Sequence, residues 1–162
     1  MAERLAEGRT KVARQLDRLD PFTFWTIPRD GVAEFVVVGT TGAFLIAVVS
    51  TPGTVDLQKG RLAVDGVALD GHRRLKSEAK RLQLTFSQAT VPVQVEPVIC
   101  LTHAVAGAPR IDRGVRVVHV RDLAKDIADR PRVLLRLRAQ RAARVLGMKL
   151  AGDERRIFIG GR

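Results

Sequence analysis

The chain has 162 residues, of which 46% are hydrophobic and 28% charged, and it carries one cysteine and a net charge of +11. This balance excludes a disordered chain and is enough for one domain with an aliphatic core. The single cysteine, Cys100, excludes an internal disulfide and a multi-cysteine zinc site. The positive charge favours polyanionic partners, with a GC-rich genome as the alternative source of the arginine excess.

The first element along the chain is a predicted helix over residues 2–19, which ends before Pro21. Its apolar residues recur at helical spacing and form one face, made of Ala2, Leu5, Val12, Leu16 and Leu19. The segment has no apolar signal core, so we expect a cytoplasmic protein. Residues 22–28 are predicted to be extended, and residues 29–31 form a turn.

The most apolar part of the chain is EFVVVGTTGAFLIAVVS, residues 34–50. A membrane span needs about 20 apolar residues in a row, whereas here Glu34 stands at one end and GTTG interrupts the middle. Two β-branched runs around turn residues indicate a hairpin instead, with strands near 32–38 and 43–50. Because both strands are apolar on both faces, we expect them to be covered on both sides. No membrane association is predicted.

The remaining elements alternate between strands and helices. Residues 54–69 predict two short strands around a turn at Lys59 and Gly60, and residues 70–89 predict a helix with a stripe of Leu75, Ala79, Leu82 and Phe86. A buried strand near 95–103, a loop over 104–114 and a strand over 115–120 follow. A short helix is expected at 121–128.

The last predicted helix begins with Pro131 in its first turn and runs to Leu146, with Gly147 as its stop. Its core stripe is Leu135, Ala139, Ala142 and Leu146. The order of elements predicts an α/β or α+β fold with a central mixed β-sheet flanked by helices. We expect a single domain over residues 1–150 and a tail over residues 151–162.

Three stretches in series resemble the nuclease-related domain (NERD) family: EFVVVGTTGAFLIAVV, then GTVDLQKGRLAVDG, then a basic helix followed by the strand VEPVICL. The similarity covers residues 10–146. It implies a restriction-endonuclease-like fold. In that family an Asp on the first hairpin strand and a Glu-x-Lys on the second bind Mg²⁺ and polarise the phosphate or water, often with a helical Glu and Gln.

The resemblance places these family positions on residues that are mostly unable to do this chemistry. The Asp falls on Glu34, and the Glu and Lys of Glu-x-Lys fall on Ala47 and Val49. The first-helix Glu falls near Thr10, and the middle-helix Gln falls near Arg74. A lone Glu34 does not hold Mg²⁺, so the resemblance implies a degenerate site with no metal and no cofactor.

An alternative is an active site with relocated ligands, for which Asp56, Asp65 and Glu78 are the available acids. The three histidines, His72, His103 and His119, lie in different sequence contexts, and we do not expect them to form a metal site. No serine stands in a nucleophile-elbow context. Whether any metal-dependent cleavage survives stays open at this stage.

The remaining signal is two basic segments predicted to be helical, residues 72–81 and 130–144. Arginine at helical spacing binds successive phosphates, and neither segment is balanced by acids. Exposed aromatic residues for base stacking are few, so we expect binding to the phosphate backbone that is salt-sensitive and independent of sequence. The predicted nucleic-acid-binding residues are Arg73, Arg74, Lys76, Lys80, Arg81, Arg132, Arg136, Arg141 and Arg144.

These observations predict a catalytically inactive nuclease-like domain that binds DNA or RNA through its arginine-rich helices. The alternative is an inactive scaffold or subunit that binds a protein partner, with the apolar stretch and the tail RRIFIGGR as its interface. A third alternative is a metal-dependent nuclease with relocated ligands. The sequence does not distinguish DNA from RNA and does not indicate the oligomeric state.

Overall fold

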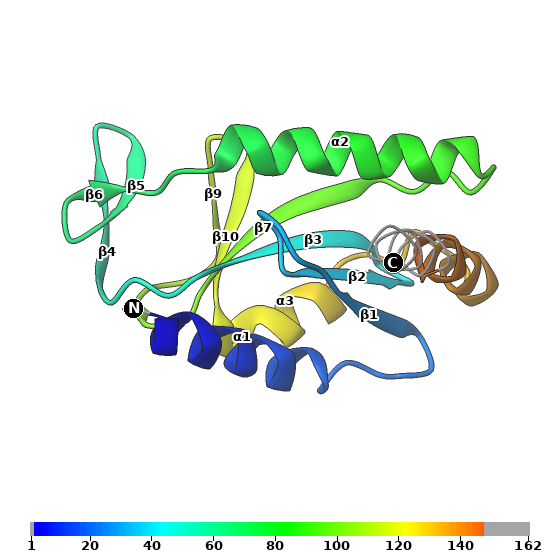
Figure 1. Cartoon of the computed structure of the whole chain (residues 1–162), viewed down its shortest axis with the longest axis horizontal. Helices are drawn as coiled ribbons and strands as arrows, with labels where there is room; N and C mark the ends of the chain where they lie inside the picture. The colour runs from blue at the N-terminus through cyan, green and yellow to red at the C-terminus, as the bar shows by residue number, and fades with distance from the viewer. Residues whose placement is uncertain (1, 148–162) are drawn as a thin grey trace, which may run out of the picture.

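The apolar stretch 34–50 lies at the centre of the main sheet in the computed structural model, which describes residues 2–147 (Figure 1). It forms an antiparallel hairpin of strands β2 (Phe35–Gly39) and β3 (Gly42–Val49), and Thr40 and Thr41 make the turn. The predicted hairpin is therefore confirmed. Within residues 2–147, no helix combines the length and the apolar character that a membrane span requires.

The main sheet has six strands in the order β1-β2-β3-β7-β10-β9. The strands besides the hairpin are β1 (Phe24–Pro28), β7 (Val95–Leu101), β9 (Arg110–Asp112) and β10 (Val115–His119). β7 pairs in parallel with both β3 and β10, and the other pairs are antiparallel. The predicted mixed sheet is confirmed, and the carboxyl ends of its three parallel strands meet at one edge.

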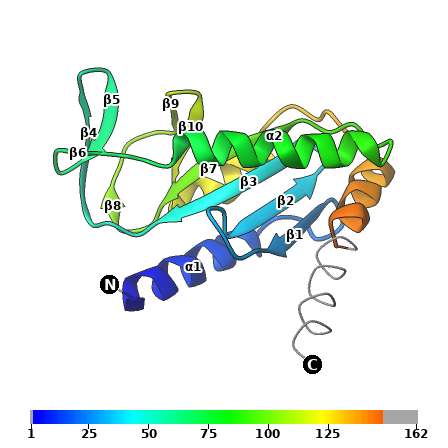
Figure 2. The same cartoon turned by 45° about the horizontal axis from the view of Figure 1, so that its top comes forward.

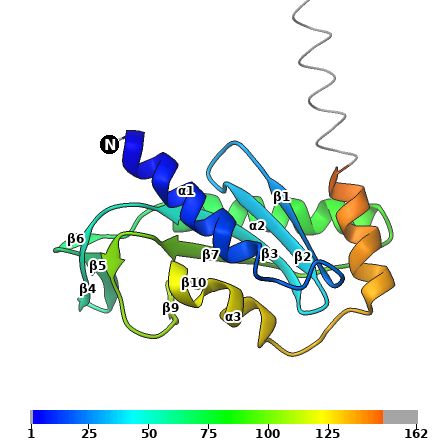
Figure 3. The same cartoon turned by 90° about the horizontal axis from the view of Figure 1, so that it is seen from below.

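Helices cover both faces of this sheet (Figures 1, 2 and 3). One face carries α2 (His72–Gln88) and a final helix over residues 136–147. The other carries α1 (Ala2–Leu16), the short 3₁₀ helix η1 (Val120–Asp122) and α3 (Leu123–Ala128). This arrangement confirms the prediction that helices flank a central sheet.

Successive side chains of a strand point to opposite faces, so the sheet separates two hydrophobic cores. Under α2, Val36 and Leu45 pack with the predicted α2 stripe, all four members of which are buried. On the other face, Phe44 packs with Val12 of α1 and Leu123 of α3. The hairpin is thus buried on both sides, as its continuous apolar composition predicts.

The predicted apolar face of α1 is only partly correct. Val12 and Leu16 are buried as expected, but Ala2 and Leu5 are exposed. Gly8 is the buried residue of the second turn instead. A Cβ at Gly8 would lie 2.1 Å from Ser50 Oγ, so α1 crosses the end of β3 at this glycine and its first turn has no strand to cover.

A second, smaller sheet has the strand order β6-β5-β4-β8. Its strands are β4 (Gly53–Gln58), β5 (Arg61–Val64), β6 (Val67–Ala68) and β8 (Ala104–Val105). The predicted turn at Lys59 and Gly60 is confirmed, and both residues have positive φ, as in a type I′ hairpin turn.

The predicted loop over residues 104–114 is wrong, because this segment contributes β8 to the small sheet and β9 to the main sheet. β9 and β10 form another two-residue hairpin, in which Arg113 has φ 49° and Gly114 has φ 79°. Arg-Gly is a weaker turn signal than Asn-Gly or Asp-Gly, and three-residue strands leave little alternation to detect.

A buried polar pair joins the small sheet to the rest of the molecule. His72 at the start of α2 lies with Nε2 2.7 Å from Asp112 Oδ2 of β9. The Leu62 N–H of β5 donates to the other Asp112 oxygen at 3.0 Å. One carboxylate thus connects α2, β5 and β9, and both partners of the pair are almost fully buried.

The start of the final helix differs from the prediction. Residues 131–135 are not helical, and the helix occupies residues 136–147, the last of which is Gly147 at the end of the described range. The backbone N–H groups of Val133 and Leu134 both donate to the Thr40 carbonyl, at 2.9 and 3.0 Å. This pairing holds the segment outside a helix, and Leu135 is 73% exposed rather than part of the core.

Candidate nucleic-acid interface

Glu34, the position that the resemblance gives to a metal-binding acid, is used to hold the hairpin. Its Oε2 accepts a hydrogen bond from the Val48 N–H at 2.9 Å, and its own N–H donates to the Ile46 carbonyl at 2.9 Å. The side chain is half-buried. Burial raises the pKa of the Glu34 carboxyl, although the hydrogen bond from Val48 acts in the opposite direction.

Of the five positions that the resemblance assigns, Glu34, Ala47 and Val49 lie close together on the hairpin. The two helical positions lie elsewhere. Phe35 pairs with Ile46, which places Glu34 opposite Ala47 in the antiparallel register. Ala47 and Val49 both pack against the core beneath α2. Their side chains offer neither a ligand for a metal nor a proton to a reaction.

The two helical positions face solvent on opposite sides of the sheet. Thr10 is exposed on α1, and its hydroxyl donates to the Ala6 carbonyl of the same helix at 3.0 Å. Arg74 is exposed on α2. Because α1 and α2 cover different faces, these two side chains do not join Glu34 in one site.

The acids that could supply relocated metal ligands do not converge in the part of the chain that is described. Asp56 is exposed on β4, whereas Asp65 accepts a hydrogen bond from the Thr54 N–H in the same small sheet. Glu78 pairs with Arg29. Residues 2–147 contain no group of three or more His, Cys, Asp or Glu side chains arranged to hold a metal ion.

The outer face of α2 carries a concentration of unpaired positive charge. Arg73, Arg74, Lys80 and Arg81 are all exposed, and none has an ion pair within residues 2–147. We call these four residues the α2 cation face. Lys76 is also exposed, but its ammonium group donates to the Arg113 carbonyl at 2.9 Å.

The arginines near the last helix fall into two groups. Arg132, Arg141 and Arg144 are exposed and have no acid partner among the described residues. Arg136 is engaged instead, because its guanidinium lies 3.5 Å from the centre of the Phe22 ring and its Nε donates to the Phe22 carbonyl at 2.9 Å. This helix packs near the carboxyl end of α2 (Figures 1 and 2).

A polar cluster at the carboxyl ends of β3 and β7 was missed by sequence reasoning. Thr102 Oγ1 lies 3.1 Å from Ser50 Oγ and 2.8 Å from His103 Nδ1, and His103 Nε2 lies 3.4 Å from Glu7 Oε2. Ser50 and Thr102 are buried beneath Gly8 of α1. The cluster links α1 to the ends of β3 and β7.

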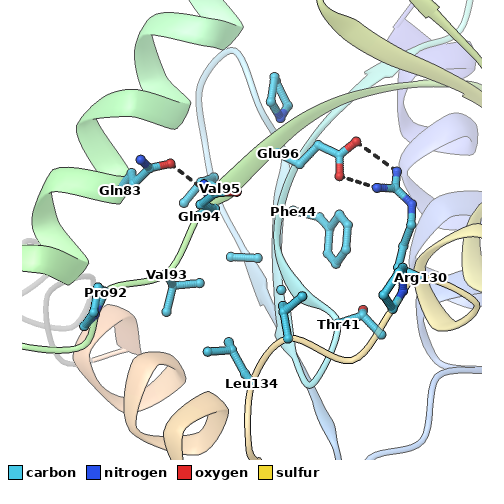
Figure 4. Close-up of a pocket in the computed structure, with 15 residues that line it drawn as sticks. Thr41, Phe44, Gln83, Pro92, Val93, Gln94, Val95, Glu96, Arg130 and Leu134 are labelled. Atoms are coloured by element: carbon cyan, nitrogen blue, oxygen red, sulfur yellow. Dashed lines mark hydrogen bonds and ion pairs between the residues drawn. The ribbon is translucent and has the colours of Figure 1, made fainter.

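A pocket of about 560 Å³ lies near the amino ends of β3 and β7, at the edge of the main sheet opposite this polar cluster (Figure 4). Its charged side chains are already paired, since the Arg130 guanidinium binds Glu96 through two hydrogen bonds of 2.6 and 2.9 Å. Phe44, Val93 and Leu134 give the rest of the wall an apolar character. The pocket therefore suits an apolar group better than an anion.

Comparison with known proteins adds no family to this geometry, because no family model, curated protein or solved structure matches the chain.

Proposed function

We propose that the chain is a non-cleaving, nuclease-like domain that binds the phosphate backbone of nucleic acid through the α2 cation face. The observation that carries the proposal is the division of charge on α2. Glu78 is the only acid in this helix and lies on its inner side with Arg29, whereas Arg73, Arg74, Lys80 and Arg81 are exposed without acid partners. The exposed charge is therefore available to a polyanion.

The spacing of the α2 cation face suits a ligand with repeated negative charges. Arg73 and Lys80 are seven residues apart, as are Arg74 and Arg81, which corresponds to about 10 Å along a helix axis. Arginine binds phosphate oxygens bidentately, and lysine adds a point charge. Such contacts read the backbone and not the bases, so the proposal predicts little sequence preference.

The second part of the proposal, the absence of cleavage, is supported by the residues around Glu34. Its carboxylate is bound to the Val48 N–H, and its neighbours at the family positions are Ala47 and Val49. A hard divalent cation needs several oxygen ligands in near-octahedral geometry. One half-buried carboxylate with apolar neighbours does not meet this requirement.

The test compares nucleic-acid binding by the wild type and by a variant in which Arg73, Arg74, Lys80 and Arg81 are all replaced by Gln. Fluorescence anisotropy with labelled duplex DNA and single-stranded RNA at low salt measures the affinity. A control variant loses the same charge at exposed positions elsewhere, namely Arg4, Lys59, Arg61 and Lys125. Both variants change only exposed side chains, so the circular dichroism spectrum should stay the same.

We expect the α2 variant to lose about tenfold or more in affinity, because each lost phosphate contact removes a charge-assisted hydrogen bond. The control variant should retain binding within about threefold, since it loses the same charge without losing a proposed phosphate contact. Neither protein should cut the nucleic acid with Mg²⁺ or Mn²⁺. Equal losses in the two variants would reject the α2 face as the interface, and metal-dependent cutting would reject the inactive site.

A second candidate function is the binding of a protein partner. The stretch 34–50 does not provide its interface, because β2 and β3 are buried, and the tail residues 155–162 lie outside the described residues. The observation that favours a partner is the apolar pocket of Figure 4, beside which Val133 is 66% exposed. A co-purifying protein that is lost from Val133→Asp, and kept by the α2 variant, would support this function.

A further inference from the structure

A shallow hollow of about 280 Å³ lies between α1 and η1, on the face of the sheet opposite α2. Most of its lining residues carry a positive charge, and no acid is among them. We call it the α1–η1 hollow and define it by Lys11, Arg14, Gln15, Arg18, Val120 and Arg121. It was not visible in the sequence, because its residues come from segments about 100 positions apart.

Two elements bring these charges together. On α1, Lys11, Arg14 and Gln15 follow helical spacing, while Val12 and Leu16 beside them are buried against the sheet. Arg18 lies in the turn that follows the helix. Arg121 comes from η1, where its backbone N–H donates to His119 Nδ1 at 3.2 Å. Its guanidinium donates to the Ala106 carbonyl at 2.6 Å, which fixes the side chain.

The acids near the hollow neutralise only part of its charge. Glu7 lies 3.9 Å from the Lys11 ammonium group, and Asp122 lies 3.6 Å from Arg121 Nε. Arg14 and Arg18 have no acid partner within residues 2–147. Four cations of which two are ion-paired leave the hollow positive, and a concave surface focuses that potential.

The end of α1 explains only part of this arrangement. Carbonyl groups at a helix C-terminus stabilise nearby cations, which accounts for Arg14 and Arg18. It does not account for Arg121, which belongs to another element and is directed by its own hydrogen bond to Ala106. The positive field also reaches a neighbouring histidine, since Arg121 and Lys11 add to the effect of burial in lowering the pKa of His119.

We propose that the α1–η1 hollow is a binding site for a phosphate group. Arg14 and Arg18, which have no acid partner among the described residues, offer bidentate hydrogen bonds to its oxygens. Arg121 adds its charge from the opposite side, and Lys11 and Gln15 supply further donors. The volume is close to the lower limit of small-ligand pockets, so it holds a phosphate with little else. The ligand is a phosphate ester at the end of a nucleic acid or on a small metabolite. The site does not depend on the α2 cation face.

The first experiment follows the ring signals of the histidines by NMR during pH titrations of the full chain. Inorganic phosphate is the probe, and chloride at equal ionic strength is the reference. Bound phosphate should raise the pKa of His119, because it offsets the positive field of Arg121 and Lys11. The increase should saturate with phosphate concentration.

Variants separate this site from the proposed nucleic-acid interface. Replacing both Arg14 and Arg18 by Gln should weaken phosphate binding by about tenfold or more. The α2 variant should bind inorganic phosphate as the wild type does, even if it has lost DNA. Phosphate binding that is unsaturable, absent, equal to the chloride effect, or unchanged in Arg14→Gln/Arg18→Gln would overturn the site.

The source of the phosphate is distinguished in the background of the α2 variant. A single-stranded oligonucleotide with a 5′-phosphate is compared with the same strand carrying a 5′-hydroxyl, and ribose 5-phosphate represents the small metabolites. Tighter binding of the phosphorylated strand, or competition by ribose 5-phosphate, supports the site and assigns its ligand. No preference for any phosphorylated probe over its hydroxyl counterpart would contradict it.

Discussion

The carboxylate of Glu78 lies 4.0 Å from the guanidinium of Arg29, on the inner side of α2. Its Oε2 is buried and accepts no hydrogen bond within residues 2–147. This relationship removes the only acid of α2 from the outer face of the helix. The α2 cation face consequently meets solvent without an internal counter-ion, which is the basis of the proposed interface.

Restoring an acid to the outer face should weaken nucleic-acid binding. Ser77 is exposed, four residues after Arg73 and four before Arg81, so a carboxylate there reaches both. We expect Ser77→Glu to reduce the affinity for duplex DNA by about fivefold or more at low salt, whereas Ser77→Gln should bind as the wild type does. The thermal midpoint should stay the same or rise slightly. Equal affinities of the Glu and Gln variants would exclude contact with this face.

Glu34 should lower the stability of the protein at neutral pH. Its pKa is raised by burial, so the folded state disfavours the ionised carboxyl. The free energy of unfolding therefore falls as the pH rises from the unfolded pKa, about 4.3, through the higher folded pKa. Glu34→Gln keeps an oxygen that accepts from the Val48 N–H and removes the buried charge. It should be more stable than the wild type at pH 7.

Urea denaturation at pH 7 and at pH 3.5 measures this difference. The advantage of Glu34→Gln should shrink at pH 3.5, where the wild-type carboxyl is protonated as well. Asp56→Asn, an equivalent change at an exposed acid, should leave stability nearly unchanged at both values. A Glu34→Gln protein that is less stable than the wild type at pH 7 would show that the ionised carboxylate is needed.

Asp112 should be a major contributor to the stability of the small sheet. Asp112→Ala leaves the Leu62 N–H and the His72 ring without their buried partner, and each loss costs about 1–3 kcal/mol. We expect a total loss of about 2 kcal/mol or more in urea denaturation. Asp112→Asn retains an oxygen for the Leu62 N–H and should lose less. Similar losses for both variants would show that the charge itself, and not the hydrogen bonds, is required.

The contact between Gly8 and Ser50 should appear as a coupling energy. A Cβ at Gly8 would lie 2.1 Å from Ser50 Oγ, so Gly8→Ala should destabilise the protein by about 1–3 kcal/mol despite the better helix propensity of Ala. In the Ser50→Ala background the cost should fall by about 1 kcal/mol, because the closest clashing atom is gone. Chemical denaturation of the four proteins of this cycle gives the value. If the free-energy changes of the two substitutions were strictly additive, Gly8 and Ser50 would not be in contact.

Much of the fold follows from local patterns in the sequence. Continuous β-branched runs around Thr40 and Thr41 specify a doubly covered hairpin, and the spacing of Leu75, Ala79, Leu82 and Phe86 specifies the buried side of α2. Pro131 was misleading, because proline fits both the first turn of a helix and an extended segment. The N–H groups of Val133 and Leu134 bind the Thr40 carbonyl, and this contact between distant segments has no local signal.

The candidate site also has features that local sequence patterns predict and features that they do not. The cations of α2 and their exposure follow from helical spacing, and Glu78 stands three residues after the buried Leu75, on the flank of the core stripe. The engagement of Arg136 by Phe22 depends instead on residues more than 100 positions apart. The same holds for the α1–η1 hollow, where Arg121 lies beside residues of α1. Such sites arise from the packing of separate elements.

The most direct test of the central claim is the salt dependence of duplex DNA binding by the wild type, the α2 variant and the matched control variant. Affinity is measured by anisotropy from about 50 to 200 mM salt, and each phosphate contact contributes about −0.9 to the slope of log K against log[salt]. We predict that the α2 variant has a slope about 3.6 units shallower than the wild type, from four lost contacts, and that the control variant keeps the wild-type slope. Identical slopes for the wild type and the α2 variant would contradict the account.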